Sequence, residues 1–120
     1  MATEQNFSQF RLGEDWQITI QCCDSSGAAL DLTGGDLKVR LADFDRTTLY
    51  LDLSKAGGVS ITNAVQGIGV ALITAAMQRD AALTAQTFRY DALAVLADGT
   101  ESDQAFGTLT AAPSLFSAFP

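Results

Sequence analysis

The sequence predicts an all-β protein: an antiparallel β-sandwich of about seven strands, with one short helical turn near residues 74–83. Apolar and polar residues alternate over several segments, as they do in strands that turn one face toward a core. Turn-forming residues recur about every ten residues, which is typical of the short strands of a sandwich. The chain has 120 residues, of which 48% are hydrophobic. That suffices for one core and is too little for two.

The clearest strand is predicted over residues 16–22, which end at a cluster of turn formers. Its apolar residues fall at every second position and therefore share one face; they are Trp16, Ile18, Ile20 and Cys22. Residues 37–41 and 49–53 are predicted to pair as a hairpin around a turn at 43–46. In the second of these strands we expect the leucines to point inward and Tyr50 to point away from them.

The middle of the chain predicts two further strands and the helical turn. Residues 59–61 make a short strand, and residues 69–73 make another after a glycine-containing turn. Thr74 can cap a helix that begins there, and the residues that follow are good helix formers. The segment is too short to be stable alone, so we expect it to lie across an edge of the sandwich.

The longest strand is predicted over residues 86–97. One face is assigned to the core, namely Phe88, Tyr90, Ala92, Ala94 and Leu96. Leu93 and Val95 lie on the other face, so that face should also be partly covered. An Asp98-Gly99 pair predicts a tight hairpin into a last strand over residues 102–110.

The two ends of the chain are expected to differ from the domain between them. Residues 1–6 are polar and predict a flexible arm, residues 7–110 form the sandwich domain, and residues 111–120 form an apolar C-terminal tail. The tail has two prolines, no charge, and three large apolar residues: Leu115, Phe116 and Phe119. This tail can fold back on its own sandwich or dock on a neighbouring subunit, and the sequence favours neither.

The charge balance argues against several partners. The net charge is −7, and the seven Lys and Arg residues are scattered, so no positive face is available for nucleic acid or for an anionic membrane. No apolar run approaches the roughly 18 residues of a membrane span. The charged fraction of 18% is below the usual value of about 25%. This predicts a bland surface, part of which a neighbour covers.

The cysteines predict the compartment in which the chain is made. Cys22 and Cys23 are adjacent and cannot easily bridge each other in a strand, so no disulfide framework is expected. Residues 1–10 lack the pattern of a signal peptide. The sequence therefore predicts synthesis in a reducing cytoplasm.

The residues offer little for catalysis, and no enzyme, cofactor or metal is expected. The chain has no histidine, the commonest general base and metal ligand. Asp43 and Asp45 lie two positions apart and offer oxygen ligands of the kind that bind calcium, yet ordinary turn-forming aspartates explain the pair better. Trp16 fits core packing better than sugar stacking, which leaves Tyr50 as the candidate for an exposed aromatic contact.

Three stretches carry a resemblance to a known family. Gly13-Glu14-Asp15 leads into the alternating strand, Asp31-Leu32-Thr33-Gly34 precedes the next strand, and Phe88-Arg89-Tyr90-Asp91 opens a late one. Over about residues 10–110 this order resembles the small immunoglobulin-like domains of bacteriophage tail and baseplate proteins, in particular the N-terminal domain of baseplate upper proteins. Phe88 stands where those domains usually have a tyrosine.

The resemblance implies an immunoglobulin-like sandwich with a structural or accessory role in a bacteriophage or prophage-derived virion, in its tail, baseplate or fibre attachment. The protein would be made in the bacterial cytoplasm and reside in the virion. Its partners would be itself and other virion proteins, in a homo-oligomer or a larger assembly. The interaction candidates are Leu115, Phe116, Phe119 and Tyr50. The alternative is a carbohydrate- or host-surface-binding module, which requires two or more exposed aromatic residues on one face.

Overall fold

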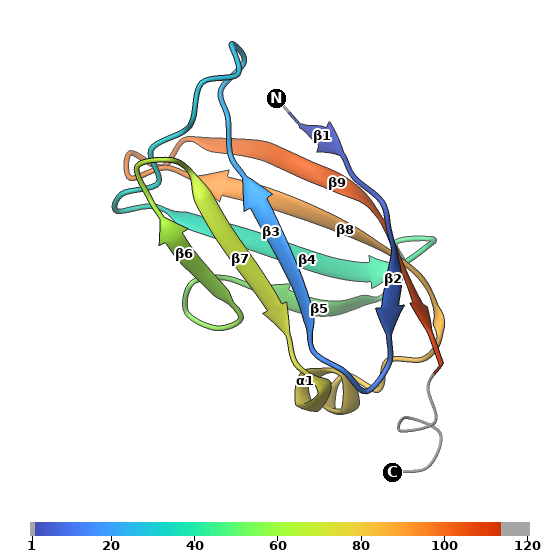
Figure 1. Ribbon diagram of the computed structural model, residues 1–120. Coiled ribbons are helices and arrows are strands. Elements are labelled where there is room, and N and C mark those ends of the chain that lie inside the picture. Colours follow the sequence, from blue (N-terminus) through green and yellow to red (C-terminus); the bar gives the residue numbers. More distant parts are fainter. Residues whose placement is uncertain (1, 114–120) are drawn as a thin grey trace.

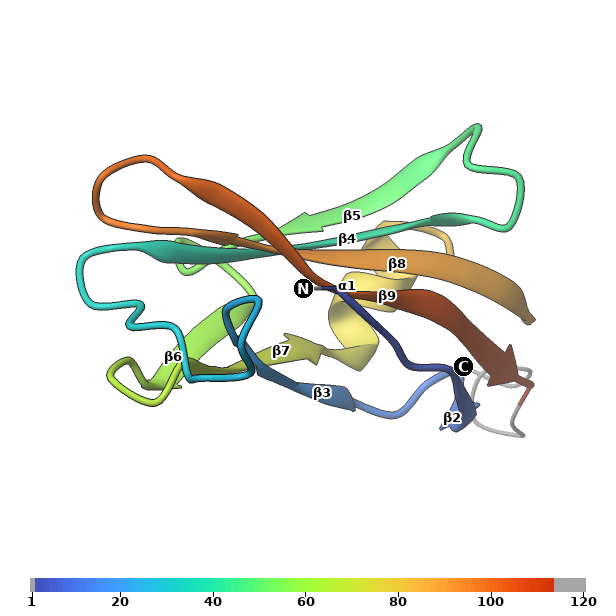
Figure 2. The ribbon, with the colours of Figure 1, turned by 90° about the horizontal axis from the view of Figure 1, so that it is seen from above.

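The structure is a computed structural model that describes residues 2–113. It consists of two β-sheets packed face to face (Figures 1 and 2). Sheet A contains β1 (Thr3–Glu4), β2 (Phe7–Arg11), β4 (Asp36–Asp43), β5 (Leu49–Leu53), β8 (Gln86–Val95) and β9 (Glu101–Ala112). Sheet B contains β3 (Trp16–Gln21), β6 (Val59–Asn63) and β7 (Ile68–Ile73). One helix, α1 (Ala75–Asp80), lies at the end of the sandwich where β7 stops (Figure 1).

The strand order identifies the type of sandwich. Sheet A runs β1-β9-β8-β4-β5, with β2 also beside β9, and sheet B runs β3-β7-β6. In immunoglobulin domains the second, fourth and fifth strands form one sheet, and the third, sixth and seventh form the other. When β3 is taken as the second strand and β5 as the extra strand of variable-type domains, this chain has the same division. The predicted all-β, immunoglobulin-like sandwich is thus confirmed.

The alternating strand over residues 16–21 forms as predicted and supplies the centre of the core. Trp16, Ile18 and Ile20 are buried, while the residues between them are exposed. The indole Nε1 of Trp16 donates to the Arg11 carbonyl oxygen at 2.7 Å, and its ring stacks on Phe10 at 5.7 Å. The indole therefore joins both sheets, because Phe10 belongs to sheet A.

The β4–β5 hairpin forms, but one of its strands is turned differently from the prediction. Leu41 pairs with Leu51 and Ala42 with Leu49, so Tyr50 is the extra residue of a β-bulge. The bulge reverses the alternation beyond it. Leu49 is 53% exposed, and Tyr50 packs inward. The expectation that Tyr50 points away from the inner face is wrong for this reason.

The N-terminal residues are more ordered than the predicted arm. Thr3 and Glu4 pair in parallel with Ala105 and Phe106 of β9, and β2 continues the parallel pairing further along β9. The expected flexible arm over residues 1–6 is therefore wrong for residues 3 and 4. A short polar segment gives no local sign of a backbone partner that lies a hundred residues away.

A break between β1 and β2 is held by side chains and one glycine. The Tyr90 hydroxyl donates to the Gln5 carbonyl oxygen at 2.6 Å. The backbone N–H of Thr108 donates to Asn6 Oδ1 at 2.9 Å. Between these two contacts lies Gly107, whose φ of +153° suits glycine. A β-bulge in β9 lies nearby, between the residues that pair with Ala92 and Leu93.

The C-terminal boundary differs slightly from the prediction. Strand β9 continues to Ala112, so residues 111 and 112 belong to the sandwich and not to the tail. Ala111 is buried. Residues 114–120, which include Leu115, Phe116 and Phe119, lie outside the described residues.

Helix α1 begins as predicted and fastens one end of the sandwich. The Thr74 hydroxyl accepts from the Met77 backbone N–H at 3.2 Å, and the helix ends at Asp80, before the predicted residue 83. Gln78 is buried; its Oε1 accepts from Gly13 N–H at 3.0 Å and its Nε2 donates to the Glu14 carbonyl oxygen at 2.6 Å. Gln78 thus ties α1 to the β2–β3 turn. Among residues 2–113 no helix has the length and apolar character needed to cross a bilayer.

Candidate functional site

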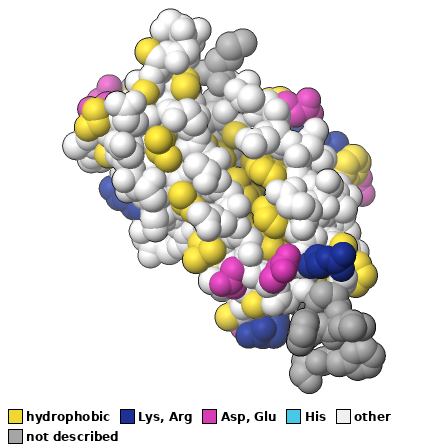
Figure 3. All heavy atoms as spheres, viewed as in Figure 1, with side chains coloured by type: hydrophobic (Ala, Val, Ile, Leu, Met, Phe, Trp, Pro, Cys, Tyr) yellow, Lys and Arg dark blue, Asp and Glu magenta, His cyan; other side chains and the backbone are white. Residues whose placement is uncertain are grey.

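The outer face of sheet B carries no charge. Every Lys, Arg, Asp and Glu of the chain lies outside β3, β6 and β7. In Figure 3, which shows this side of the molecule, charged side chains colour only the margin of the face. We call this surface the neutral face; it consists of Gln17, Thr19, Gln21, Ser60, Asn63, Ile68, Val70 and Leu72.

The neutral face has an apolar stripe with a polar border. Its central strand, β7, turns Ile68, Val70 and Leu72 outward, and Leu72 is 40% exposed. The flanking strands contribute only amides and hydroxyls. Thr19 and Ser60, for example, stand on either side of Val70 in the pairing register. The stripe follows from strand periodicity, because the alternate residues of β7 fill the core.

The outer face of sheet A is different, since it holds a depression of about 320 Å³ lined mostly by charged side chains. We call it the charged groove. It is lined by Lys38 and Arg40 of β4, Asp91 and Leu93 of β8, and Glu101 and Asp103 of β9. Its cations therefore lie on one side of β8, and two of its anions lie on the other.

Few of the groove's charges are neutralised within the chain. Arg40 Nε lies 3.2 Å from Asp52 Oδ1, and both side chains are largely exposed, so this pair contributes little stability. This is the one ion pair among residues 2–113. Burial raises the pKa of Asp91, the negative charge of Asp103 raises it further, and Arg46 partly offsets both.

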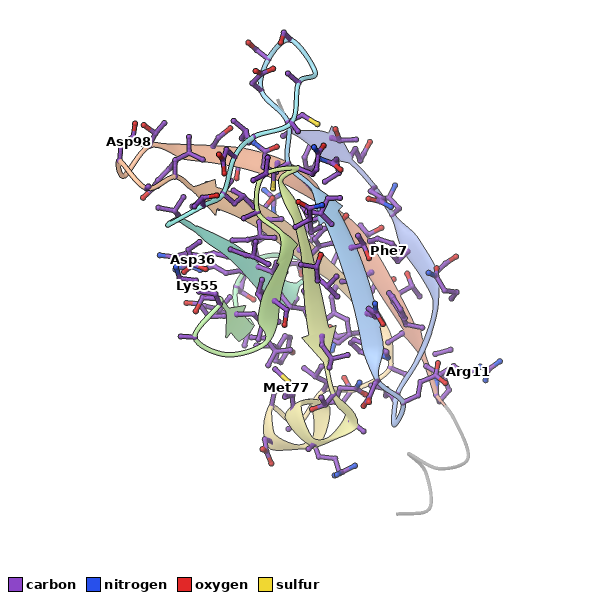
Figure 4. All side chains as sticks on the ribbon, turned by 60° about the vertical axis from the view of Figure 1, so that its left-hand side comes forward. Phe7, Arg11, Asp36, Lys55, Met77 and Asp98 are labelled. Carbon is purple, nitrogen blue, oxygen red and sulfur yellow. The ribbon has the colours of Figure 1, made fainter. Side chains whose placement is uncertain are left out.

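At one end of the groove lies the Asp36 carboxylate, which already accepts a hydrogen bond from the backbone of Lys55. Asp36 and Lys55 lie together there (Figure 4). Asp36 Oδ1 accepts from the Lys55 backbone N–H at 2.9 Å, and Lys55 Nζ donates to the Gly35 carbonyl oxygen at 2.5 Å. These contacts hold the β5–β6 turn against the start of β4.

The predicted aromatic candidate is not a surface platform. Tyr50 is half-buried, and its ring meets Phe88 edge-on at 5.5 Å. The exposed aromatic that sequence reasoning missed is Phe44, at 48% exposure, in the β4–β5 turn. The Arg89 guanidinium lies 4.2 Å from the centre of that ring, so one face of Phe44 is occupied.

The neutral face could be predicted from the sequence alone, whereas the charged groove could not. The lack of charge in three predicted strands was visible, and it could have indicated the neutral face. The charged groove required the strand register, because Lys38, Leu93 and Asp103 form one row only when β4, β8 and β9 are adjacent.

The aspartates in turns accept hydrogen bonds from backbone N–H groups of the same turns. Asp43 accepts from the backbone N–H groups of Thr47 and Thr48, at 2.7 and 2.9 Å, and from the Thr47 hydroxyl at 2.6 Å. Within residues 2–113 no group of three or more His, Cys, Asp or Glu side chains is arranged to hold a metal ion. Cys22 and Cys23 are free thiols, and burial raises the pKa of Cys22 to about 11.

These turns predict an acid-sensitive fold. Hydrogen bonds to the carboxylate lower the pKa of Asp24, Asp31, Asp43 and Asp98. A carboxyl whose pKa is lower in the folded state stabilises the fold above its unfolded pKa of about 3.9 and loses that effect as pH falls through the folded value. We expect the free energy of unfolding to decrease as pH falls below about 4.

Denaturant unfolding at pH 7, 5, 4, 3 and 2.5 measures this decrease. Asp43→Asn removes one of these four carboxyls, so the free energy of unfolding of this variant should change less with pH. Asp45→Asn is the matched control in the same turn. A fold that is equally stable at pH 5 and pH 2.5 would show that the turn carboxylates do not contribute.

Comparisons with known proteins add little to these surfaces. No protein-family profile matches the sequence, and no curated protein matches it. Among solved structures the chain is similar to murine CRIg, with a TM-score of 0.37 and 12% identity, over 94% of this chain and 92% of that chain. The strand order, rather than this likeness, defines the fold.

Proposed function

We propose that the protein is a structural or accessory component of a bacteriophage or prophage-derived virion and that it acts through protein–protein contacts. The observation that most supports this proposal is the neutral face. Covering a charge with protein costs free energy unless the charge is paired, and the centres of protein interfaces are depleted of charged residues. A neighbour can cover the neutral face without removing any ion from water.

The arrangement of the neutral face also suits a protein partner. Protein interfaces commonly have an apolar centre and a polar rim. Here Ile68, Val70 and Leu72 form the centre, and the amides and hydroxyls of β3 and β6 form the rim. The assignment to a virion rests on the resemblance of the Asp31–Gly34 and Phe88–Asp91 stretches to phage tail and baseplate domains.

No feature of the described residues supports the alternative that the protein binds carbohydrate. It requires two or more exposed aromatic rings on one face. Among the described residues, four aromatic side chains are buried, namely Phe10, Trp16, Phe88 and Tyr90. Phe7 packs on Phe10 and Tyr90, Tyr50 packs on Phe88, and Phe44 is stacked by Arg89. Phe106 is half-buried on the outer face of sheet A.

Site-specific photo-crosslinking in the cells that make the protein tests the proposal. A photoreactive residue replaces Thr19 at the centre of the neutral face, and a matched variant carries it at Ala56, in an exposed turn. Particles are then purified, and the crosslinked products are identified by mass spectrometry. We expect position 19 to crosslink at least about tenfold more than position 56.

The outcomes separate the two parts of the proposal. Absence of the protein from purified particles would rule out the virion role. Presence in particles with equal crosslinking from both positions would show that the neutral face is not the contact surface.

A further inference from the structure

The charges at the two edges of the groove lie on opposite sides of β8. Lys38 and Arg40 lie on β4, and Glu101 and Asp103 lie on β9, with β8 between them. Adjacent strands are about 4.8 Å apart, so the backbones of β4 and β9 are separated by about 10 Å. Lys38, Glu101 and Asp103 make no ion pair with any residue of the described part of the chain.

We propose that the outer face of sheet A binds the same face of a second copy of the chain, around a two-fold axis that runs along β8. Such an axis places β4 of each copy over β9 of the other. A two-fold interface uses the same patch twice, so each favourable contact occurs twice. The Lys38 edge of each groove then meets the Asp103 edge of its partner.

The first row of the groove fits this arrangement. Register places Lys38, Leu93 and Asp103 side by side across β4, β8 and β9. About the proposed axis, Lys38 faces Asp103 of the second copy, and Asp103 faces the second copy's Lys38. Leu93 lies at the axis and meets its own equivalent, which buries an apolar side chain between the two ion pairs.

The second row balances its charge as well. It contains Arg40, Asp91 and Phe106 in register. Two copies bring two guanidinium groups and two Asp91 carboxylates together near the axis, with no net charge. Arg40 also lies over Phe106 of the second copy, a contact that favours a cation on an aromatic ring.

The mixed charges of the groove favour a second copy over a wholly basic or a wholly acidic partner. A basic partner would satisfy Glu101 and Asp103 but leave Lys38 and Arg40 facing like charge, and an acidic partner would do the reverse. A second copy brings an opposite charge to Lys38 and to Asp103 at once, while Glu101 lies over the row that contains Asp36 and Val95 in the second copy. Because this face is opposite the neutral face, the inference does not depend on the proposed virion contact and is tested on different residues.

Charge reversal tests the dimer. Sedimentation equilibrium of the full chain at 0.1 M salt gives the dimer dissociation constant. We expect Lys38→Glu and Asp103→Lys each to raise that constant at least about tenfold, which corresponds to about 1.4 kcal/mol. The double variant should return it to within about threefold of the original, because the pair is restored with its signs exchanged.

Two controls keep the result specific. Thr19→Glu adds a charge to the neutral face and should leave the dissociation constant unchanged, and denaturant unfolding shows whether each variant is folded. A full chain that is monomeric at millimolar concentration would overturn the proposal. It would also be overturned if the double variant were as weak as the single ones, or if neither single variant weakened the dimer.

Discussion

Replacing Trp16 by alanine is expected to lower the free energy of unfolding by about 3–5 kcal/mol. The indole is fully buried and contacts the rings of Phe10 and Phe88, at 5.7 and 6.4 Å between centroids. Its removal leaves a cavity where the two sheets meet, and it leaves the Arg11 carbonyl oxygen without its donor. Since small domains are stable by only about 5–15 kcal/mol, a large part of the stability is lost.

Urea unfolding measures the effect. It is followed by circular dichroism and not by tryptophan fluorescence, because the variant lacks the chain's single tryptophan. Leu72→Ala, on the exposed side of β7, is the control and should change the free energy of unfolding by less than about 0.5 kcal/mol. A loss of less than about 1 kcal/mol for Trp16→Ala would contradict the central role of the indole.

Gly107→Ala is expected to release the N-terminal strands from β9 at a cost of at least about 2 kcal/mol. A Cβ at this position would collide with the Gln5 carbonyl oxygen and lie 2.7 Å from Asn6 Oδ1. The φ of +153° adds strain for any residue with a side chain. Neither the Gln5 backbone nor the β9 backbone can move without breaking the parallel pairing of β1.

Hydrogen exchange locates the change that unfolding alone cannot. The Gln5 amide donates to the Phe106 carbonyl oxygen, and the Thr108 amide donates to Asn6 Oδ1, so both should lose protection in Gly107→Ala. Amides of β3 and β7 should keep theirs. Gly57→Ala is the matched control, since a Cβ there meets nothing within 4 Å. Unchanged protection at Gln5 would show that the strand tolerates a side chain at position 107.

Strands with strict alternation could be predicted from sequence because the pattern and the burial have the same cause. Residues 16–21 are an example, since the core needs an apolar side chain at each second position. Tyr50 could not be placed in this way. Its orientation depends on a one-residue bulge opposite Leu41 and Ala42, and no property of Tyr50 or its neighbours marks the position of that bulge.

Buried polar side chains were missed for a related reason. Gln104 is buried because it is the extra residue of the bulge in β9. Its Oε1 accepts from the Cys23 backbone N–H at 2.8 Å. A glutamine in an alternating strand is normally read as outward, and only the partner strand's register reveals otherwise.

The two candidate surfaces differ in the same way, because one follows from the sequence and the other from the pairing of strands. The neutral face depends on composition within three strands, which the sequence states directly. The charged groove depends on which strands are neighbours, and Lys38 and Asp103 are far apart in sequence. The tail residues Leu115, Phe116 and Phe119 lie outside the described residues, so their role in contacts stays a prediction.

The pairing of β1 and β2 with β9 has a consequence for the order of events during synthesis. Asn6 and Thr108 are separated by 102 positions, so a ribosome must make nearly the whole domain before residues 3–11 can find their partner. Until then Phe7 and Phe10 have no β9 to pack beside, and the nascent chain exposes them. Non-local pairing of this kind slows folding. We therefore expect residues 3–11 to join sheet A only after β9 has left the exit tunnel.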